Sequence, residues 1–197
     1  MKSFFSELRT SVLITAVFVI LLCGAYPLAV WAGGQLLFRA KADGSLVTDR
    51  DGAVRGSALL AQSFTGDRYF HPRPSAAGTG YDATSSSGTN LGPTSKKLAD
   101  AIQAAVAAYR AENHLAADVP VPADAVTSSG SGLDPDISPA NAALQAPRIA
   151  AARHLPLAEV QALVAAQTRV RDLGVLGEPR VNVLLLNRAL DLAAPTR

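Results

Sequence analysis

The residues best suited to chemistry form one run of small polar and turn-forming residues, Thr127–Pro139, which reads TSSGSGLDPDISP. Glycines permit backbone angles that leave successive N–H groups free, and a helix beginning at Pro139 would add the positive end of its dipole. The run therefore predicts either an anion-holding loop over Ser129–Gly132 or a tight turn that docks one element on the next. Asp134 and Asp136 would oppose an anion, and they suit local capping or weak cation binding instead.

Familiar catalytic signatures do not occur in the sequence. No glycine-rich phosphate loop carries the required lysine, and the nucleophile elbow Gly-x-Ser-x-Gly is missing. The Asp-Lys-Thr-Gly phosphorylation sequence is also missing. If the chain belongs to an ATP-driven pump, it is not the phosphorylated subunit.

Metal and nucleic-acid chemistry are also disfavoured. The single cysteine, Cys23, excludes both an internal disulfide and a zinc cluster, and the three histidines are far apart. A net charge of +2 with few aromatic residues argues against nucleic acid. An anchored enzyme using Ser131, His71 and an aspartate is an alternative that no spacing supports. We expect no catalytic residue, no metal and no tightly bound cofactor.

The elements that must position this loop begin with an uncharged stretch from Thr10 to Phe38. A helix of about 29 residues spans about 43 Å, which exceeds the roughly 30 Å hydrocarbon core of a bilayer. A cleavable signal is the main rival, because Lys2 and Arg9 form a basic start, yet its apolar core would be shorter. We therefore predict a retained anchor, which Pro27 should kink.

Small residues recur at every fourth position of this anchor, at Ala25, Ala29 and Gly33. Such a stripe lets a second membrane helix approach closely, although alanine is common throughout this chain. Basic residues flank the anchor on both sides, so charge counting leaves its orientation open.

After the anchor, the pattern predicts one helix-rich α+β domain over residues 39–197. Expected short elements are a strand at 45–48, a helix from Ser57 to Gln62 and an extended strip or edge strand over 119–126. Residues 65–94 have no apolar periodicity and predict a long functional or disordered loop.

Helices are predicted where caps and periodicity agree. Ser95 should start a helix that ends near Asn113, and Ser138-Pro139 should start another, which Pro147 breaks into two segments. A further helix should begin at Pro156, and residues 181–186 should form a buried strand followed by a helix.

Several longer strings, in this order along the chain, carry a family resemblance. They are GSALLAQSF (56–64), YFHPRPSA (69–76), NLGP (90–93), the loop at 127–139, QAPR (145–148) and GEPRVNVL (177–184). Together they resemble the KdpC family, whose members belong to the bacterial Kdp potassium-transporting ATPase, and the similarity runs from the anchor to the last helix. Ala61, Ser128 and Asp136 depart from the usual glycine, alanine and histidine, which puts any histidine role at 136 in doubt.

The resemblance implies an accessory, non-catalytic subunit of a high-affinity, ATP-driven potassium uptake complex. It implies a single-pass inner-membrane protein, with cytoplasmic residues 1–9, a transmembrane helix over 10–38 that can extend into the periplasm, and a periplasmic domain. The implied partners are a channel-like potassium-binding subunit, a P-type ATPase subunit and membrane lipid. It also implies a catalytic chaperone that raises the affinity of the pump for ATP, and the matching nucleotide-binding residues are Ser129, Gly130, Ser131, Gly132 and Gln145.

Two hypotheses follow from this. In the first, the anchor packs through its small residues against the channel-like subunit, and the domain stabilises the assembly from outside. In the second, the Gly-Ser loop binds ATP, although a periplasmic domain cannot touch nucleotide hydrolysed in the cytoplasm.

Overall fold

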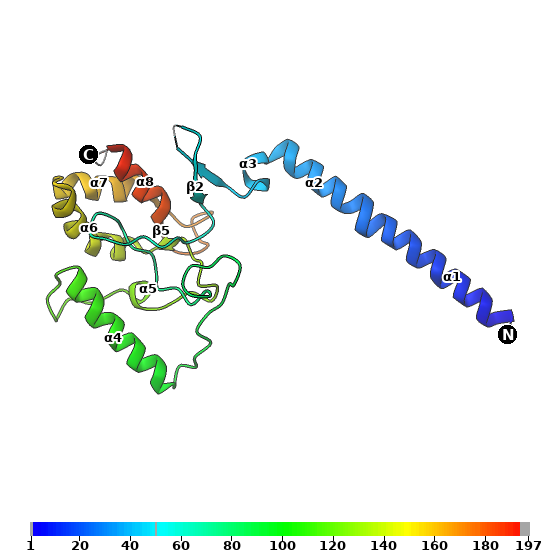
Figure 1. The fold of residues 1–197 in the computed structure, drawn as a ribbon, viewed down its shortest axis with the longest axis horizontal. Coiled ribbons are helices and arrows are strands. Elements are labelled where there is room, and N and C mark those ends of the chain that lie inside the picture. The colour runs from blue at the N-terminus through cyan, green and yellow to red at the C-terminus, as the bar shows by residue number, and fades with distance from the viewer. Residues whose placement is uncertain (1, 50, 194–197) are drawn as a thin grey trace. The chain divides into compact units, whose positions relative to one another are not determined.

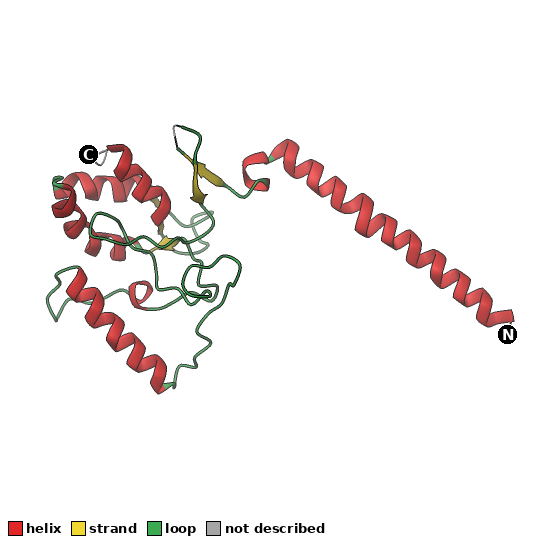
Figure 2. Cartoon of the chain, in the orientation of Figure 1, coloured by secondary structure: helices red, strands yellow, loops and turns green. Residues whose placement is uncertain are grey.

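The computed structural model describes residues 2–49 and 51–193, so the outer ends of the predicted regions, residues 1 and 194–197, lie outside the described residues. The chain divides into two compact units, residues 1–54 and 55–197. Helices predominate over short strands (Figure 2), which confirms the predicted helix-rich α+β class.

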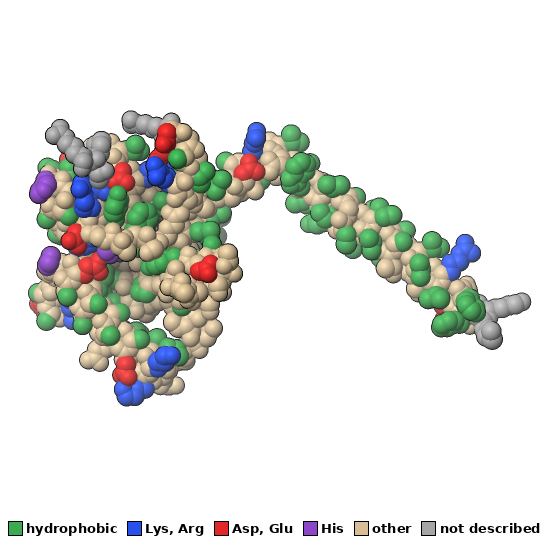
Figure 3. Space-filling model, in the orientation of Figure 1, with side chains coloured by type: hydrophobic (Ala, Val, Ile, Leu, Met, Phe, Trp, Pro, Cys, Tyr) green, Lys and Arg blue, Asp and Glu red, His purple; other side chains and the backbone are tan. Residues whose placement is uncertain are grey.

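The first unit is built on one long helix. Its parts are α1 (Lys2–Phe18), a π-helical turn η1 (Val19–Ala25) and α2 (Tyr26–Leu37). Residues 3–37 are long and apolar enough to cross a membrane, and none of their most apolar window is buried in the chain. Apolar side chains are visible along this helix in Figure 3. The long apolar helix predicted for this region is therefore present, and it begins before Thr10.

Pro27 does not interrupt this helix. The π-helical turn η1 ends two residues before Pro27, and the Tyr26 N–H bonds to the carbonyl of Leu21, five residues back. Proline lacks an N–H, and a π turn is one way for a helix to absorb the resulting mismatch in its hydrogen bonds. Beyond α2, the short helix α3 (Arg39–Ala42) precedes Asp43, which accepts a hydrogen bond of 2.9 Å from the Gln35 side chain.

Two short strands follow. The strand β1 (Leu46–Thr48) confirms the prediction for this segment, and it forms a two-stranded sheet with β2 (Val54–Ser57), which the sequence pattern missed. The helix expected from Ser57 to Gln62 is wrong. Ser57 instead closes a turn on the Leu59 N–H, and the Ala61 N–H bonds to Leu133, so tertiary contacts override the local helix pattern.

The second unit contains five helices and three further strands among the described residues (Figure 1). They are α4 (Lys96–Glu112), α5 (Ala123–Val126), β3 (Asp136–Ile137), α6 (Pro139–Arg153), α7 (Leu157–Gln167), β4 (Thr168–Arg169), β5 (Arg180–Asn182) and α8 (Val183–Ala193). Residues 65–94 contain neither helix nor strand, as predicted.

The core of this unit lies where α6, α7 and α8 pack beside a small antiparallel sheet of order β3-β5-β4. Val181 on the central strand pairs with Ile137 on one side and Thr168 on the other. Phe70, from the long loop, is fully buried among these elements. The other core residues are Ile137, Ala142, Ala146, Ile149, Ala150, Val160, Val164, Val181, Val183, Leu186 and Leu190.

Three predicted boundaries are corrected. Pro147 lies inside the continuous helix α6, because Ala146, Ile149 and Ala150 around it are buried in the core and their packing offsets the lost hydrogen bond. The strip at 119–126 ends in a single helical turn, α5. The strand predicted for 181–186 ends at Asn182, whose side chain accepts the Leu185 N–H and so starts α8.

Candidate functional site

The backbone of residues 68–71 in the long loop is bonded to side chains rather than to another strand. Arg153 Nε donates to the carbonyl of Arg68 at 2.7 Å, and Arg148 Nη2 donates to the carbonyl of Tyr69 at 3.2 Å. Both arginine side chains come from α6 and are almost fully buried. Helix α6 therefore supplies hydrogen-bond donors for the carbonyls of Arg68 and Tyr69 in this loop.

Phe70 and His71 are each bonded to a single amide side chain through both the backbone N–H and the backbone carbonyl. Asn187 of α8 accepts the Phe70 N–H at 2.8 Å and donates to its carbonyl at 2.9 Å. Gln145 of α6 does the same for His71, at 2.7 and 3.1 Å. We call Gln145 and Asn187 the amide clamp, because each imitates the paired bonds of a neighbouring strand.

Gln145 has no unused hydrogen-bonding capacity of note. Its side chain also donates to Asn141 Oδ1 at 2.8 Å and accepts from Arg148 Nη2 at 3.2 Å, and the residue is 1% exposed. Two donated and two accepted bonds are all that a side-chain amide can make. A ligand could bond to this amide only by displacing a bond that holds the fold.

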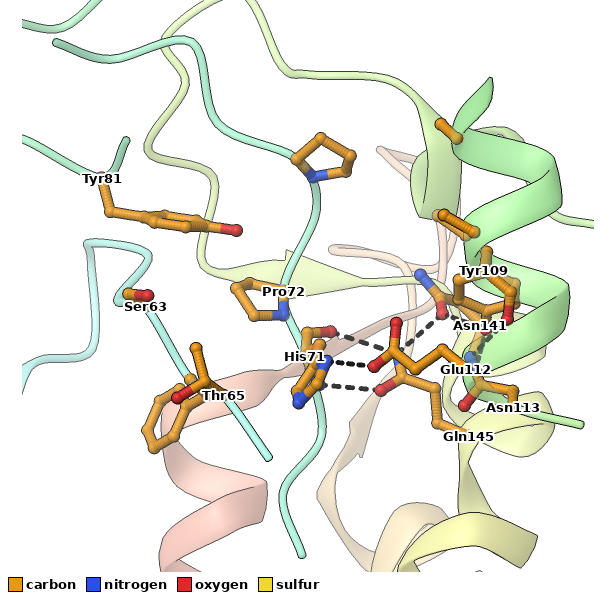
Figure 4. Close-up of a pocket in the computed structure, with 15 residues that line it drawn as sticks. Ser63, Thr65, His71, Pro72, Tyr81, Tyr109, Glu112, Asn113, Asn141 and Gln145 are labelled. Atoms are coloured by element: carbon orange, nitrogen blue, oxygen red, sulfur yellow. Dashed lines mark hydrogen bonds and ion pairs between the residues drawn. The ribbon is translucent and has the colours of Figure 1, made fainter. Parts of the chain in front are cut away.

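A cavity of about 320 Å³ lies between the long loop and α4, beside the amide clamp. Figure 4 shows His71, Glu112 and Gln145 pointing toward one another at this cavity. The lining residues are Ser63, Phe64, Thr65, His71, Pro72, Pro74, Tyr81, Ala105, Ala108, Tyr109, Glu112, Asn113, Ala125, Asn141 and Gln145. Its wall combines apolar and aromatic residues with polar ones, and Ser63 and Thr65 lie on the opposite side from Glu112 and Gln145 (Figure 4).

The charged group of this cavity is Glu112, which is ion-paired. Its Oε1 lies 2.5 Å from His71 Nδ1 and 3.7 Å from Arg148 Nη2. The hydrogen bond from His71 lowers the pKa of the Glu112 carboxyl, partial burial opposes this, and Arg148 adds to it. Glu112 is therefore held as a carboxylate between two basic groups.

Tyr109 and Asn141 extend the polar network to the start of α6. The Tyr109 hydroxyl donates to Asn141 Oδ1 at 2.8 Å, and burial raises the pKa of this phenol, with the negative charge of Asp124 adding to the effect. Asn141 Nδ2 in turn donates to Asp124 Oδ2 at 2.9 Å.

The amino-terminal end of α6 is occupied by groups of the protein itself. Ser138 Oγ accepts the Asn141 N–H at 3.0 Å and donates to Asp124 Oδ1 at 2.9 Å, while the Ser138 N–H bonds to the other oxygen of Asp124. A carboxylate at a helix amino terminus is stabilised by the helix dipole. The Asp124 carboxylate therefore occupies the amino-terminal end of α6, near which the sequence pattern suggested that an anion could bind.

The Ser-Gly loop is a docked, hydrogen-bonded turn. The Gly132 N–H bonds to Ser129 Oγ at 2.9 Å, and the Leu133 N–H bonds to Ser131 Oγ at 3.1 Å. The Ser131 carbonyl accepts the Ser87 N–H at 3.0 Å, which fixes the turn against the long loop. These bonds favour the docking interpretation over the anion-holding loop.

Gly132 has a positive φ of 67° at this docking point. A Cβ added here would come within 2.6 Å of the backbone of Ala77 and Ser87. Ser75 Oγ donates to the Gly132 carbonyl and accepts the Tyr81 N–H, so the turn also supports one wall of the cavity. Only glycine fits this close contact.

Asp134 and Asp136 are neutralised by arginines. Asp134 pairs with Arg73 at 2.7 Å, and Asp136 pairs with Arg180 at 3.3 Å. Burial raises the pKa of the Asp136 carboxyl, and the neighbouring charge of Asp134 adds to the rise. These carboxylates therefore hold segments together, and they do not form an open pair for a cation.

With this geometry in place, comparison with known proteins identifies the family. The model of the KdpC family, "K+-transporting ATPase, c chain", matches residues 8–192. This chain belongs to the KdpC family. It is 55% identical over 190 residues to the "Potassium-transporting ATPase KdpC subunit" of Caulobacter vibrioides (strain NA1000 / CB15N), covering 96% of this chain and 95% of that protein. It is also 55% identical over 185 residues to the protein of that name from Mycobacterium tuberculosis (strain ATCC 25618 / H37Rv), covering 94% and 97%.

Membership of the KdpC family confirms the resemblance drawn from the sequence strings. It makes the chain a subunit of a potassium-transporting ATPase complex, and the single apolar helix fits a single-pass membrane protein.

Within this KdpC chain, the predicted nucleotide-binding residues lie in different settings. Gln145 lines the cavity, whereas Ser129, Gly130, Ser131 and Gly132 are not among its lining residues. The catalytic arrangement considered as an alternative is not assembled either, because the Ser131 hydroxyl contacts Ser129 and Leu133 while the His71 ring faces Glu112 and Gly66. The amide clamp was not predicted from the sequence, because Phe70 and Asn187 are 117 positions apart in the chain.

The predicted packing residues of the anchor are available for contact. Ala25 ends η1, while Ala29 and Gly33 lie on α2, and none is buried in the chain. A Cβ built on Gly33 would meet no atom within 4 Å.

Proposed function

We propose that this chain holds the potassium-transporting ATPase complex together as a non-catalytic accessory subunit. The observation that supports the proposal is the apolar helix of residues 3–37. Its most apolar stretch is not buried against any other described part of the chain. A helix of this kind must be covered by lipid or by other membrane helices. The partners that fit are the channel-like potassium-binding subunit and the P-type ATPase subunit.

The proposed topology places the amino terminus in the cytoplasm and the domain in the periplasm, with the helix in the inner membrane. The small residues Ala25, Ala29 and Gly33 then form the contact face toward a partner helix, because small side chains let two backbones approach closely. The domain stabilises the assembly from the outer side.

This structural role is better supported than direct nucleotide binding. The amide of Gln145 makes four bonds within the protein, and Asp124 occupies the start of α6. The Gly132 and Leu133 N–H groups are bonded to serine hydroxyls. An effect on the ATP affinity of the pump, which the resemblance implies, would then reach the ATPase subunit through contacts in the assembly.

A matched pair of helix variants tests the proposal. Gly33→Leu and Gly24→Leu add the same side chain where a Cβ meets no atom within 4 Å, but the two positions are nine residues, or about two and a half turns, apart. They therefore face opposite sides of the helix. A tagged copy carrying Gly33→Leu should lose most of the other subunits on purification in mild detergent, while Gly24→Leu should retain them. Equal recovery with both variants, or no co-purifying subunits with the wild type, would refute the proposal.

Titration of the purified chain with ATP separates the two hypotheses. The assembly role predicts no saturable binding to the isolated chain. Saturable binding at physiological ATP concentrations would restore the nucleotide hypothesis.

A further inference from the structure

The ring of His71 contacts an oxygen atom through each of its two nitrogens. Nε2 lies 2.9 Å from the backbone carbonyl of Gly66 in the long loop, and Nδ1 lies 2.5 Å from Glu112 Oε1 on α4. Gln145 bonds to both backbone groups of His71, which fixes the point from which the ring extends. The ring therefore joins the long loop to α4 at the edge of the cavity (Figure 4).

These two contacts require two protons. A carbonyl oxygen only accepts hydrogen bonds, so Nε2 must carry a proton in order to bond to Gly66. A ring nitrogen and a carboxyl oxygen 2.5 Å apart also need a proton between them, because their lone pairs would otherwise repel each other. A neutral imidazole carries only one proton. The second proton must therefore be on Nδ1 or on the Glu112 carboxyl.

The groups around the ring place the second proton on Nδ1. The hydrogen bond from His71 lowers the pKa of the Glu112 carboxyl, partial burial opposes this, and Arg148 of α6 adds to the lowering. The other titratable groups at this cluster are Asp67 in the long loop and Tyr109 on α4, which both act on Arg148. The Tyr109 phenol is neutral, because burial raises its pKa. Glu112 is therefore the carboxylate, and the His71 ring is the imidazolium.

A neutral ring has one proton for two acceptors. The Glu112 carboxylate is the stronger acceptor, because hydrogen bonds to ionised groups are stronger than neutral ones, so the remaining proton stays on Nδ1. Nε2 then turns a lone pair toward the Gly66 carbonyl, and the bond of 2.9 Å is lost. That carbonyl keeps two longer bonds, from the Tyr69 N–H and from Arg148 Nη1, both at 3.3 Å. Loss of the ring proton therefore loosens the loop at Gly66.

We propose that His71 is a pH switch, which holds residues 65–71 of the long loop while its ring is charged and loosens them when the ring is neutral. Thr65, next to Gly66, lines the cavity, so the loosened segment borders the cavity directly. Histidine is the side chain that ordinarily changes charge between about pH 5 and 8. The switch does not depend on the proposed assembly function. In the topology proposed above, it would respond to the pH of the periplasm.

Hydrogen exchange of the full chain in detergent, followed by mass spectrometry from about pH 5 to 9, tests the switch. The protection of residues 65–71, corrected for the intrinsic exchange rate, should fall roughly fivefold as the pH rises, the factor expected for one net hydrogen bond. Glu112 stays ionised throughout, because its pKa lies below the ordinary value of 4.5. Constant protection of this segment would overturn the proposal.

Two matched variants test the role of the carboxylate. Glu112→Gln keeps the shape of the side chain, and its amide N–H can donate to Nδ1 of a neutral ring, so both ring contacts survive without charge. Protection should then stay at its low-pH level throughout. Asp100→Asn makes the same change at an exposed carboxylate of α4 and should retain the fall seen in the wild type. A fall that persists in Glu112→Gln, or that disappears in Asp100→Asn, would contradict the switch.

Nitrogen NMR of the histidine-labelled full chain observes the ring protons directly. At about pH 5 both ring nitrogens of His71 should carry a proton, and at about pH 9 only Nδ1 should. The other histidines are His114 and His154, so the spectrum of His71→Gln identifies the His71 signals. A His71 ring that is neutral at the lower pH, or that keeps only the Nε2 proton at the higher pH, would exclude the proposed mechanism.

Discussion

Replacing Gln145 with methionine should destabilise the domain strongly, even though size and shape are nearly conserved. The substitution removes four hydrogen bonds, two to the His71 backbone and one each to Asn141 and Arg148. A net contribution of about 1 kcal/mol for each bond gives a loss of about 4 kcal/mol. In a chain of this size that corresponds to a fall in Tm of about 8–16 °C.

Two further variants calibrate this estimate. Asn187→Leu removes only the two bonds to Phe70, so its loss should be about 2 kcal/mol, or half that of Gln145→Met. Gln161→Met makes the same chemical change at an exposed position of α7 and should leave Tm unchanged.

Thermal unfolding of the full chain in detergent, followed by circular dichroism, measures these differences. The only tryptophan, Trp31, lies in the membrane helix, so its fluorescence does not report on the domain. A Tm for Gln145→Met within 2 °C of the wild type would refute the structural role of the amide clamp. If the large fall occurs, reduced pump activity in Gln145 variants is explained by unfolding and does not show contact with nucleotide.

Three other changes test separate parts of the structure. Gly132→Ala should lower the free energy of unfolding by at least about 2 kcal/mol, because the added Cβ would contact backbone atoms at 2.6 Å and φ is positive. Gly130→Ala adds the same methyl group where no atom lies within 4 Å, so it is the matched control. Urea unfolding measures both variants. The pKa of the Glu112 carboxyl in the folded chain lies below its ordinary value of 4.5, so its contribution to stability is complete above pH 4.5 and is lost as the pH falls through the folded pKa. The variant Glu112→Gln should therefore flatten the acid side of a plot of Tm against pH. An unchanged slope would contradict the ion pair with His71. His154 ends α6 at a φ of 56°, so His154→Gly should raise the free energy of unfolding by about 1 kcal/mol, and a lower value in chemical denaturation would contradict this.

Local signals in the sequence predicted the starts of the main helices. Ser95 and Ser138 each accept an N–H three residues ahead, from Leu98 and Asn141, as the capping pattern requires. Such bonds join neighbours in the chain, so residue type and spacing are sufficient to predict them. The apolar anchor was predictable for the same reason, because a bilayer imposes length and composition on one continuous segment.

The interior of the candidate site could not be predicted in this way. His71 meets Gln145 across 74 positions, and nothing near either residue indicates the other. Pro147 shows the opposite error, where a strong local signal for a helix break is overruled by burial of Ala146 and Ile149. In both cases the deciding energy comes from tertiary contacts, which a single sequence does not display.

The amide clamp also constrains how this protein is made. After the ribosome adds Phe70, it must add another 117 residues before Asn187 exists to bond with it. At about 5–20 residues per second, this takes roughly 6–23 s. Until then the Phe70 backbone lacks both of its native partners, although the α6 side chains that hold the neighbouring loop residues have already been added. Phe70 is therefore the last residue of this segment whose backbone can be bonded as in the folded chain.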